Sequence, residues 1–270
     1  MLWVIASEAF VRRACIALMD EDIERAADLL READTAVALT GAGVSTASGI
    51  PDFRSDGGIW DRYDPNDFHI QRFRSDPDGF WRDRAALVAE VYDGPEPNAA
   101  HEALAALEDA GALDRIVTQN VDGVHADAGS EEVIEIHGNG GRVACRDCGD
   151  RFDADPHHAA VRPGDVDGAP QCPRCDGLLK PDVVLFGERL PAHGLSEARS
   201  LARAADCFLV AGSSLTVEPV ASLPELAVDT GADLVVVNLD ETHVADRAAV
   251  DIRADVTEAL PALRRAVLDG

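Results

Sequence analysis

The chain has 270 residues and a formal net charge of -26, because 50 aspartates and glutamates stand against 24 lysines and arginines. A surface this negative repels phosphate groups, so we expect no direct binding of nucleic acid or of an anionic membrane. The 46% of hydrophobic residues suffices for a globular core. The excess of acidic residues, with Lys180 as the only lysine, favours adaptation to high salt over an acidic docking face.

The first eighteen residues differ in composition from the rest of the chain. They carry one acid and two arginines, whereas Met19 opens an acid-rich segment that is typical of a helix start. We therefore interpret Met19 as a candidate natural start and residues 1–18 as an N-terminal extension, with an additional packed helix as the alternative. Glu8 and the arginines interrupt the apolar stretch, so we expect no signal peptide and a cytoplasmic protein.

From Met19 onward, helical and extended patterns alternate along the chain. Apolar residues at helical spacing predict helices, and short, almost continuous apolar runs predict parallel strands that are covered on both faces. This alternation indicates an α/β fold with a Rossmann-like parallel sheet. In chain order, we predict a helix at 21–33, a strand at 35–40, a helix at 98–110, strands at 115–119 and 133–136, an extended segment at 183–186, strands at 207–211 and 234–237, and a helix at 255–267.

A glycine-rich segment, residues 40–49, directly follows the first predicted strand. Glycines at such a place allow backbone N–H groups to approach a pyrophosphate at the start of a helix. The third glycine of the G-x-G-x-x-G pattern is missing, and no acid-ended strand follows at the usual distance. We therefore do not expect the dehydrogenase version of this fold, and a tight turn without a ligand stays open as the alternative.

Four cysteines form two C-x2-C pairs separated by 23 residues. This spacing is typical of the two knuckles of a tetrahedral zinc site. Four thiolates leave no coordination position for water, so the predicted zinc is structural, and redox-active pairs are the weaker alternative. The predicted ligands are Cys145, Cys148, Cys172 and Cys175.

Polar side chains follow two of the predicted strands. Gln119, Asn120 and Asp122 come at the end of the strand at 115–119, where ligands bind in open α/β sheets. His137 follows the strand at 133–136, and a histidine there can act as a general base near neutral pH. A structural role for His137 is equally compatible with this spacing alone. We interpret the other seven histidines as structural.

Taken together, these motifs resemble the sirtuin family of NAD-dependent protein-lysine deacylases. The similar stretches follow the family's order from about residue 21 to about residue 265. They are Gly41–Arg54, Gly58–Trp60, Pro97–His101, Thr118–Asp122, His137–Gly138, the two C-x2-C pairs, Lys180–Glu188, Gly212–Pro219 and Asn238.

The resemblance implies a Rossmann-like parallel-sheet domain with an inserted small zinc-binding domain. The catalytic domain would span 19–268, with the zinc-binding insert at about 140–180 and a helical part of the small domain at about 55–95. It further implies NAD as cofactor, one structural zinc per chain and acetyl-lysine proteins or peptides as partners, and we expect a monomer.

The resemblance also implies residue roles. His137 would act as general base on a ribose hydroxyl of NAD, and Asn120 would position that ribose. The acyl-lysine peptide would pair as an added strand with Val184, Leu185 and Phe186. The implied NAD contacts are Gly41, Ala42, Gly43, Ser45, Asp52, Phe53, Arg54, Gln119, Asn120, Asp122, Gly212, Ser213, Ser214, Asn238 and Val256.

Several alternatives concern the substrate. Trp81-x-x-Arg84 partly matches the Tyr-x-x-Arg of the branch that prefers succinyl-lysine or malonyl-lysine. Arg84 is therefore a candidate partner of a carboxylate, together with Trp81, but solvation or a salt bridge is the more common role of such an arginine. We expect acetyl-lysine as substrate. Removal of longer or acidic acyl groups and protein mono-ADP-ribosylation are the alternative activities, and an inactive NAD-sensing module is the alternative of another class.

Overall fold

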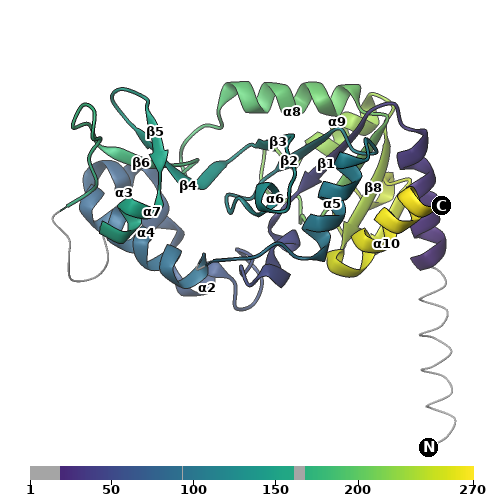
Figure 1. Ribbon diagram of the computed structural model, residues 1–270, viewed down its shortest axis with the longest axis horizontal. Coiled ribbons are helices and arrows are strands. Elements are labelled where there is room, and N and C mark those ends of the chain that lie inside the picture. Colours follow the sequence, from purple (N-terminus) through teal and green to yellow (C-terminus); the bar gives the residue numbers. More distant parts are fainter. Residues whose placement is uncertain (1–18, 93, 161–167) are drawn as a thin grey trace, which may run out of the picture.

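The computed structural model describes residues 19–92, 94–160 and 168–270. The candidate N-terminal extension at residues 1–18 lies outside the described residues. The described chain forms a large lobe around a parallel sheet and a small lobe, which we define as helices α2, α3, α4 and α7 with strands β4, β5 and β6 (Figure 1).

The large lobe is built on six parallel strands in the order β3-β2-β1-β7-β8-β9. From β1 the chain adds strands on one side of the sheet (β2, β3) and then, from β7, on the other side (β8, β9), so the strand order reverses between β1 and β7. Ligands bind at such a switch point, beyond the carboxyl ends of the strands. All strands predicted for this sheet are confirmed, and β9 is an addition that the sequence did not reveal. The strands are β1 (Ala36–Thr40), β2 (Arg115–Thr118), β3 (Val133–Glu135), β7 (Cys207–Ala211), β8 (Asp233–Asn238) and β9 (Val250–Arg253).

Helices cover both faces of this sheet (Figure 1). Along β1, Ala36 and Ala38 belong to one buried cluster and Val37 and Leu39 to the other, as the two-residue period of a strand requires. Burial on both faces explains the almost continuous apolar runs of these strands. One face carries a helix at 19–32, α5 (Ala99–Asp109) and α10 (Val256–Asp269), and the other carries α8 (Ala192–Ala204) and α9 (Leu223–Asp229).

Local sequence signals set the ends of these helices. The Asn98 side chain accepts the Ala100 N–H at 2.9 Å and begins α5. Asp255 accepts the Thr257 N–H at 2.8 Å and begins α10 in the same way. Gly111, with a φ of 73°, follows α5 where an ordinary residue would be strained.

The small lobe combines an antiparallel sheet, in the order β5-β4-β6, with helices from an earlier part of the chain. Phe80 and Trp81 of α4 share one buried cluster with Val143 and Leu179 of the sheet, so segments distant in sequence form one core. The domain boundaries that we predicted from the sequence stay a prediction. The elements are α2 (Ile59–Arg62), α3 (Ile70–Ser75), α4 (Pro77–Val91), β4 (Gly138–Cys145), β5 (Arg151–Asp153), α7 (Asp155–Ala160) and β6 (Leu179–Val183).

The extended segment predicted at 183–186 is shifted in the structure. The strand β6 ends at Val183, because its partner β4 pairs only with residues up to Val183. Beyond it, Phe186 makes a single bridge to His69.

Within the described residues, no helix combines the length and the apolar character that crossing a bilayer requires. The remaining short elements are α6 (Val124–Asp127) and 3-10 turns at Ala42–Val44, Thr46–Ser48, Pro65–Phe68 and Ala245–Arg247.

Candidate active site

The glycine loop after β1 lies against the loop after β7 at the switch point of the sheet. The Gly43 N–H donates to the Gly212 carbonyl at 2.8 Å. A Cβ on Gly43 would lie 2.8 Å from that carbonyl oxygen, and a Cβ on Gly212, whose φ is 57°, would lie 2.5 Å from the Val44 nitrogen. Only glycine allows this approach of the two backbones.

These two loops fit the pyrophosphate of NAD. Among the hydrogen bonds of the described residues, none is donated by the backbone N–H groups of Ala42, Ser213 or Ser214. Free N–H groups on touching loops at the carboxyl end of a parallel sheet are typical of phosphate-binding sites. Gln119 joins the second loop, since its Nε2 donates to Ser213 Oγ at 2.8 Å. The structure therefore brings Gly41, Ala42, Gly43, Ser45, Gln119, Gly212, Ser213 and Ser214 into one region, as the sequence suggested.

Ser45 connects the glycine loop to the polar residues that follow β2. Its hydroxyl donates to Asp122 Oδ2 at 2.8 Å and accepts from Asn120 Nδ2 at 3.0 Å. Burial raises the pKa of Asp122, although hydrogen bonds from Val124 and Ser45 oppose the shift. Ser45, Asn120 and Asp122 line one hollow together with Ala42, Phe53 and Tyr92.

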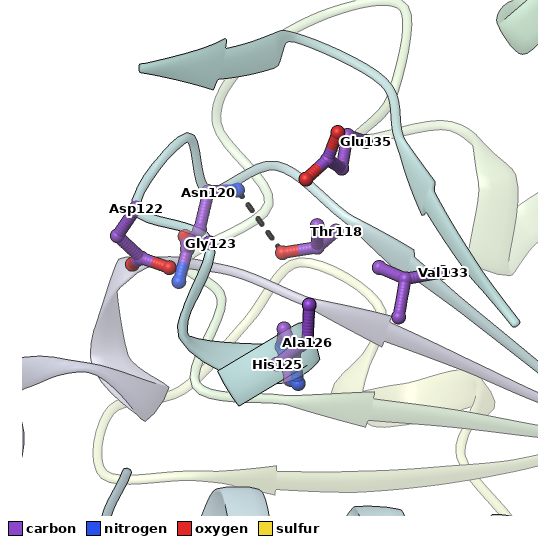
Figure 2. A pocket seen from close by; sticks show the side chains of 8 residues that line it. All are labelled: Thr118, Asn120, Asp122, Gly123, His125, Ala126, Val133 and Glu135. Atoms are coloured by element: carbon purple, nitrogen blue, oxygen red, sulfur yellow. Dashed lines mark hydrogen bonds between the residues drawn. The ribbon is translucent and has the colours of Figure 1, made fainter. Parts of the chain in front are cut away.

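Two histidines to which we assigned no functional role lie next to these residues, with His101 Nε2 at 3.4 Å from Ser45 Oγ. His125 Nε2 lies 2.9 Å from Thr40 Oγ1, and the rings of His101 and His125 are 5.0 Å apart. Burial lowers the pKa of His101 to about 4 and that of His125 to about 3, so both rings are neutral at neutral pH. Figure 2 shows His125 with Asn120 and Thr118 around a second small hollow, which Glu135 of β3 also lines. No spacing in the sequence pointed to this packing.

The two buried histidines predict a loss of stability in mild acid. The unfolded state binds protons near the ordinary histidine pKa of 6.5, which the folded rings do not bind. The contribution of His101 and His125 to the free energy of unfolding is therefore constant above this pH and falls as the pH decreases toward about 4, by up to about 1.4 kcal/mol per pH unit for each histidine.

Urea unfolding at several pH values between 7.5 and 5 measures this slope. His125→Gln is expected to reduce it, whereas the control His193→Gln is expected to leave it unchanged, since the side chain of His193 is 94% exposed. A free energy of unfolding that stays constant from pH 6.5 to 5 in the native sequence would contradict the prediction.

His137 lies in the turn that joins β3 of the large sheet to β4 of the small lobe. Its Nδ1 lies 2.9 Å from the Gln119 carbonyl, which can only accept, so Nδ1 carries the proton. In the neutral ring, Nε2 then keeps its lone pair. Burial lowers the pKa of His137, and the hydrogen bond to Gln119 partly opposes this shift. At neutral pH the ring is therefore uncharged and can accept a proton.

The four predicted cysteine ligands come together in the small lobe. All four sulfurs lie within 4.8 Å of one another, with separations of 3.5 Å for Cys145–Cys175 and 3.7 Å for Cys148–Cys172. Tetrahedral zinc with Zn–S bonds of about 2.3 Å requires sulfur separations of about 3.8 Å. The cysteines therefore fit a closed, structural zinc site.

The predicted peptide segment lies beside the turn that carries His137. The Val184 N–H donates to the His137 carbonyl at 2.8 Å, and the Phe186 carbonyl accepts from Ile70. Phe186 is 42% exposed, and its ring lies 5.4 Å from the ring of Trp60. Trp60 in turn lies 5.4 Å from Phe53, so an aromatic strip connects this segment to the hollow.

The structure corrects the expectation for Trp81 and sharpens that for Arg84. Trp81 is fully buried and its Nε1 donates to the Leu179 carbonyl at 3.1 Å, so its side chain belongs to the small-lobe core rather than to a substrate site. Arg84 is only 6% exposed and has no carboxylate partner among the described residues. Neither solvation nor a salt bridge therefore accounts for it, and burial lowers its pKa.

The remaining predicted NAD contacts lie around the edges of the cleft. Asp52 accepts the backbone N–H groups of Arg54 and Ser55 at 2.8 Å and shapes the loop that leads to Phe53. Asn238 ends β8 and is half-buried. Val256 is the first residue of α10, and because its side chain is buried in the large-lobe core, only its backbone is available to a ligand.

Comparison with known proteins agrees with this geometry. The sequence model of the Sir2 family matches residues 41–219. The chain is 53% identical over 246 residues to an NAD-dependent protein deacetylase of Haloarcula marismortui, covering 90% of this chain and 94% of that protein. It is 44% identical over 243 residues to NAD-dependent protein deacetylase 1 of Pyrobaculum aerophilum, with the same coverages of 90% and 94%.

Solved structures give the same result. A Sir2 structure with a p53 peptide and NAD+ is 39% identical, with a TM-score of 0.77, and the alignment covers 90% of this chain and 95% of that one. A Sir2 structure with a propionylated peptide has the same identity of 39% and the same coverages of 90% and 95%, with a TM-score of 0.76. The family match spans well over half of the sequence and includes the glycine loop, the Asn120 region, His137 and all four cysteines. The chain belongs to the Sir2 family, the sirtuins.

Proposed function

We propose that the chain is an NAD-dependent protein-lysine deacetylase. One observation carries this proposal. The two loops that fit a pyrophosphate, those of Gly43 and Gly212, lie in the same site as His137, a neutral histidine whose Nε2 is free to accept a proton. Relatives named NAD-dependent protein deacetylase, with coverage of nine-tenths of the chain, support it.

We assign the NAD contacts by their place in the cleft. The glycine loop and Gly212–Ser214 would hold the pyrophosphate, and Asn238 with the backbone of Val256 would hold the adenosine half. Gln119, Asn120 and Asp122 would bind the nicotinamide ribose and carboxamide. The loop of Asp52, Phe53 and Arg54 would cover the nicotinamide side.

The chemistry divides between bound NAD and the protein. When bound, NAD would supply an electrophilic ribose carbon, with nicotinamide as its leaving group and the acetyl oxygen of the substrate as its nucleophile. Through Nε2, His137 would remove the proton of a ribose hydroxyl, which would make that oxygen a better nucleophile toward the acetyl carbon. Asn120 orients the ribose, a role of proximity. Overall, NAD+, acetyl-lysine and water give nicotinamide, lysine and O-acetyl-ADP-ribose.

The peptide would add as a strand along Val184–Phe186. The Val184 carbonyl accepts no hydrogen bond among the described residues, so it is open to an extended partner, whereas the Leu185 carbonyl accepts the Glu188 N–H at 3.0 Å. Phe186 is the exposed aromatic residue of this segment, and it lies at the end of the strip that leads to the hollow. A lysine side chain entering here would approach the turn of His137.

We further propose a monomeric, cytoplasmic and salt-adapted protein. Four cysteines that form no disulfide and would bind a metal suit a reducing compartment. The net charge of -26 suits a concentrated salt solution, which screens self-repulsion. Nicotinamide release from NAD, measured with a panel of acylated peptides at low and high KCl, tests both the activity and its salt dependence. No release with any peptide at any salt concentration would contradict the proposal.

Arg84 favours a second activity, the removal of acidic acyl groups. Its guanidinium lies 6.0 Å from the centre of the Tyr92 ring, and Tyr92 lines the hollow beside Asp122. Arg84 Nη2 also lies 3.0 Å from the position that a Cβ on Gly140 would take. A buried guanidinium without an anion is costly, and a substrate carboxylate would supply the missing partner.

This second activity makes a selective prediction. Arg84→Met is expected to lower kcat/KM for a succinylated peptide by roughly 10-fold or more, because a charged hydrogen bond contributes about 1.5–3 kcal/mol. The same substitution should change kcat/KM for the acetylated peptide by less than about 3-fold, since that acyl group carries no charge to lose. The exposed Arg82 on the same helix provides the control Arg82→Met. Equal effects of Arg84→Met on both peptides would argue against a carboxylate at this site.

A further inference from the structure

The turn that carries His137 opens a gap in the small-lobe sheet. Strand β4 pairs with β6 at Gly138–Val183 and then only at Val143–Pro181, so residues 139–142 form a bulge. Gly138 sits so close to β6 that a Cβ would lie 2.0 Å from the Asp182 carbonyl oxygen. Backbone pairing with β6 therefore holds the two ends of the bulge but not its middle, which instead bonds to Val121 through the Gly140 N–H and to Ala154 through the Gly141 carbonyl.

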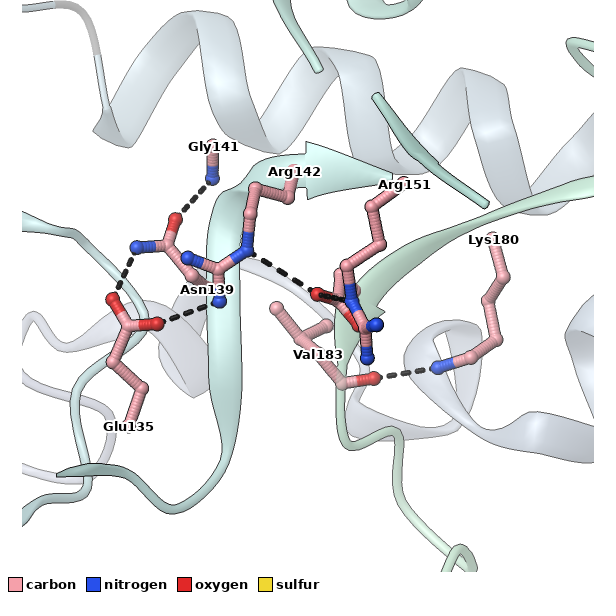
Figure 3. A network of polar contacts seen from close by, with 8 residues as sticks. Glu135, Asn139, Gly141, Arg142, Arg151, Lys180 and Val183 are labelled. Atoms are coloured by element: carbon pink, nitrogen blue, oxygen red, sulfur yellow. Dashed lines mark hydrogen bonds and ion pairs between the residues drawn. The ribbon is translucent and has the colours of Figure 1, made fainter. Parts of the chain in front are cut away.

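Side chains span this gap. Arg142 donates through Nη2 to Glu135 Oε2 at 2.6 Å and through Nε to Asp182 Oδ2 at 3.3 Å. Asn139 donates to the other oxygen of Glu135 and accepts the Gly141 N–H at 2.7 Å. Figure 3 shows these side chains meeting over the turn, with Glu135 on one side and Lys180 and Val183 on the other.

The partners of Arg142 belong to different parts of the molecule. Glu135 ends β3 of the large sheet, and Asp182 lies in β6, two residues before the proposed peptide segment begins at Val184. His137 is bonded in the same two directions, through Nδ1 to Gln119 after β2 and through its carbonyl to Val184. The separation of these two attachments decides where the imidazole lies relative to the peptide segment.

We propose that Arg142 is a positioning residue, which fixes the turn carrying His137 against Val184–Phe186. The imidazole and the bound acyl-lysine strand then keep a fixed position relative to each other. This inference rests on the proposed deacetylase function. The planar guanidinium donates in two directions from one rigid group, and a lysine ammonium cannot reproduce this geometry.

The role of Arg142 is catalytic positioning rather than overall stability. Its side chain is 40% exposed, and ion pairs at such exposure contribute only about 0–1 kcal/mol to folding. A displacement of a catalytic group by about 1 Å, in contrast, can cost up to about 100-fold in rate. A loss of rate without a loss of stability is therefore the signature of this role.

The test compares Arg142→Met with Arg151→Met in the zinc-loaded protein. Arg151 also contacts Asp182, at 2.8 Å, but it is 64% exposed and comes from β5, where it pairs with Ala144 rather than with a bulge residue. We expect Arg142→Met to lower kcat/KM for the acetylated peptide by roughly 5- to 20-fold, with unchanged KM for NAD and unchanged Tm. Arg151→Met should stay within about 2-fold of the native protein, and Arg142→Lys should fall between them.

Hydrogen exchange provides a readout that does not depend on activity. In Arg142→Met, peptides covering 136–142 and 183–186 should exchange faster, while those of the parallel sheet should not change. An inactive native protein would contradict the proposed function itself. An active native protein with equal rates for Arg142→Met and Arg151→Met would overturn only the role of Arg142, and so would faster exchange throughout the small lobe.

Discussion

Replacement of His137 by alanine is expected to lower the turnover of an acetylated peptide at least about 100-fold, the usual contribution of a positioned general base. The Gln119 carbonyl fixes the proton on Nδ1 and leaves Nε2 as the basic nitrogen. Because the ring makes no ion pair with any described residue and lies in a turn held by backbone hydrogen bonds, its removal should leave the fold and NAD binding unchanged. Steady-state kinetics with both substrates, together with Tm, measure these effects.

The pH profile of the native protein adds a second test of His137. Burial lowers its pKa below the ordinary value of 6.5, and only the neutral ring can accept a proton. We therefore expect kcat to be constant from neutral pH down to about 6.5 and to fall at lower pH as the ring becomes protonated. The control His193→Ala changes an exposed ring and should keep the native profile. Native turnover in His137→Ala would refute the assignment.

Loss of the zinc site is expected to have an equally large effect. Cys145 and Cys172 belong to the same buried cluster as Trp81 and Leu179, so the metal would hold the core of the small lobe together. Structural zinc contributes about 10–16 kcal/mol of apparent binding free energy, which is comparable to the whole stability of a domain. Cys172→Ala should therefore bind no zinc, lose the ordered environment of Trp81 and show no deacetylation.

Metal analysis, near-ultraviolet circular dichroism and activity measure the three consequences. Cys207→Ala is the matched control, because Cys207 is buried in β7 and lies outside the cluster of four sulfurs. A fully active Cys172→Ala protein would contradict a structural metal site. If the cysteines instead form disulfides and thiols reversibly in the native protein with no metal bound, the redox alternative is correct.

Much of the large lobe was predictable from local sequence. Strands such as β7 and β8 are buried on both faces, and this burial appears in the sequence as continuous apolar runs. Strand β9 was missed, because Val250–Arg253 has only four residues and lacks the continuous apolar run of the strands buried on both faces. The family resemblance implied a helical part at about 55–95, but the residue pattern did not delimit the helices at 59–91, since their aspartates, glycines and aromatic residues show no helical period.

The candidate site was predictable where the residues that act together lie in one short sequence motif. The cysteine spacing and the glycine loop are local signals, and the structure brings their residues together. The pairing of His101 with His125, the burial of Arg84 and the bulge at 139–142 depend on contacts between distant segments. Trp81 was misassigned for the same reason, since its position on α4 gave no sign that it faces the small-lobe core.

The most direct test of the account is a product measurement with the native protein, NAD and an acetylated peptide. Mass spectrometry and nicotinamide quantification should give equal amounts of nicotinamide, deacetylated peptide and O-acetyl-ADP-ribose, and all three should disappear in His137→Ala. Nicotinamide released together with ADP-ribose attached to protein, and no deacetylated peptide, would contradict a deacetylase and indicate ADP-ribosyl transfer from the same cleft.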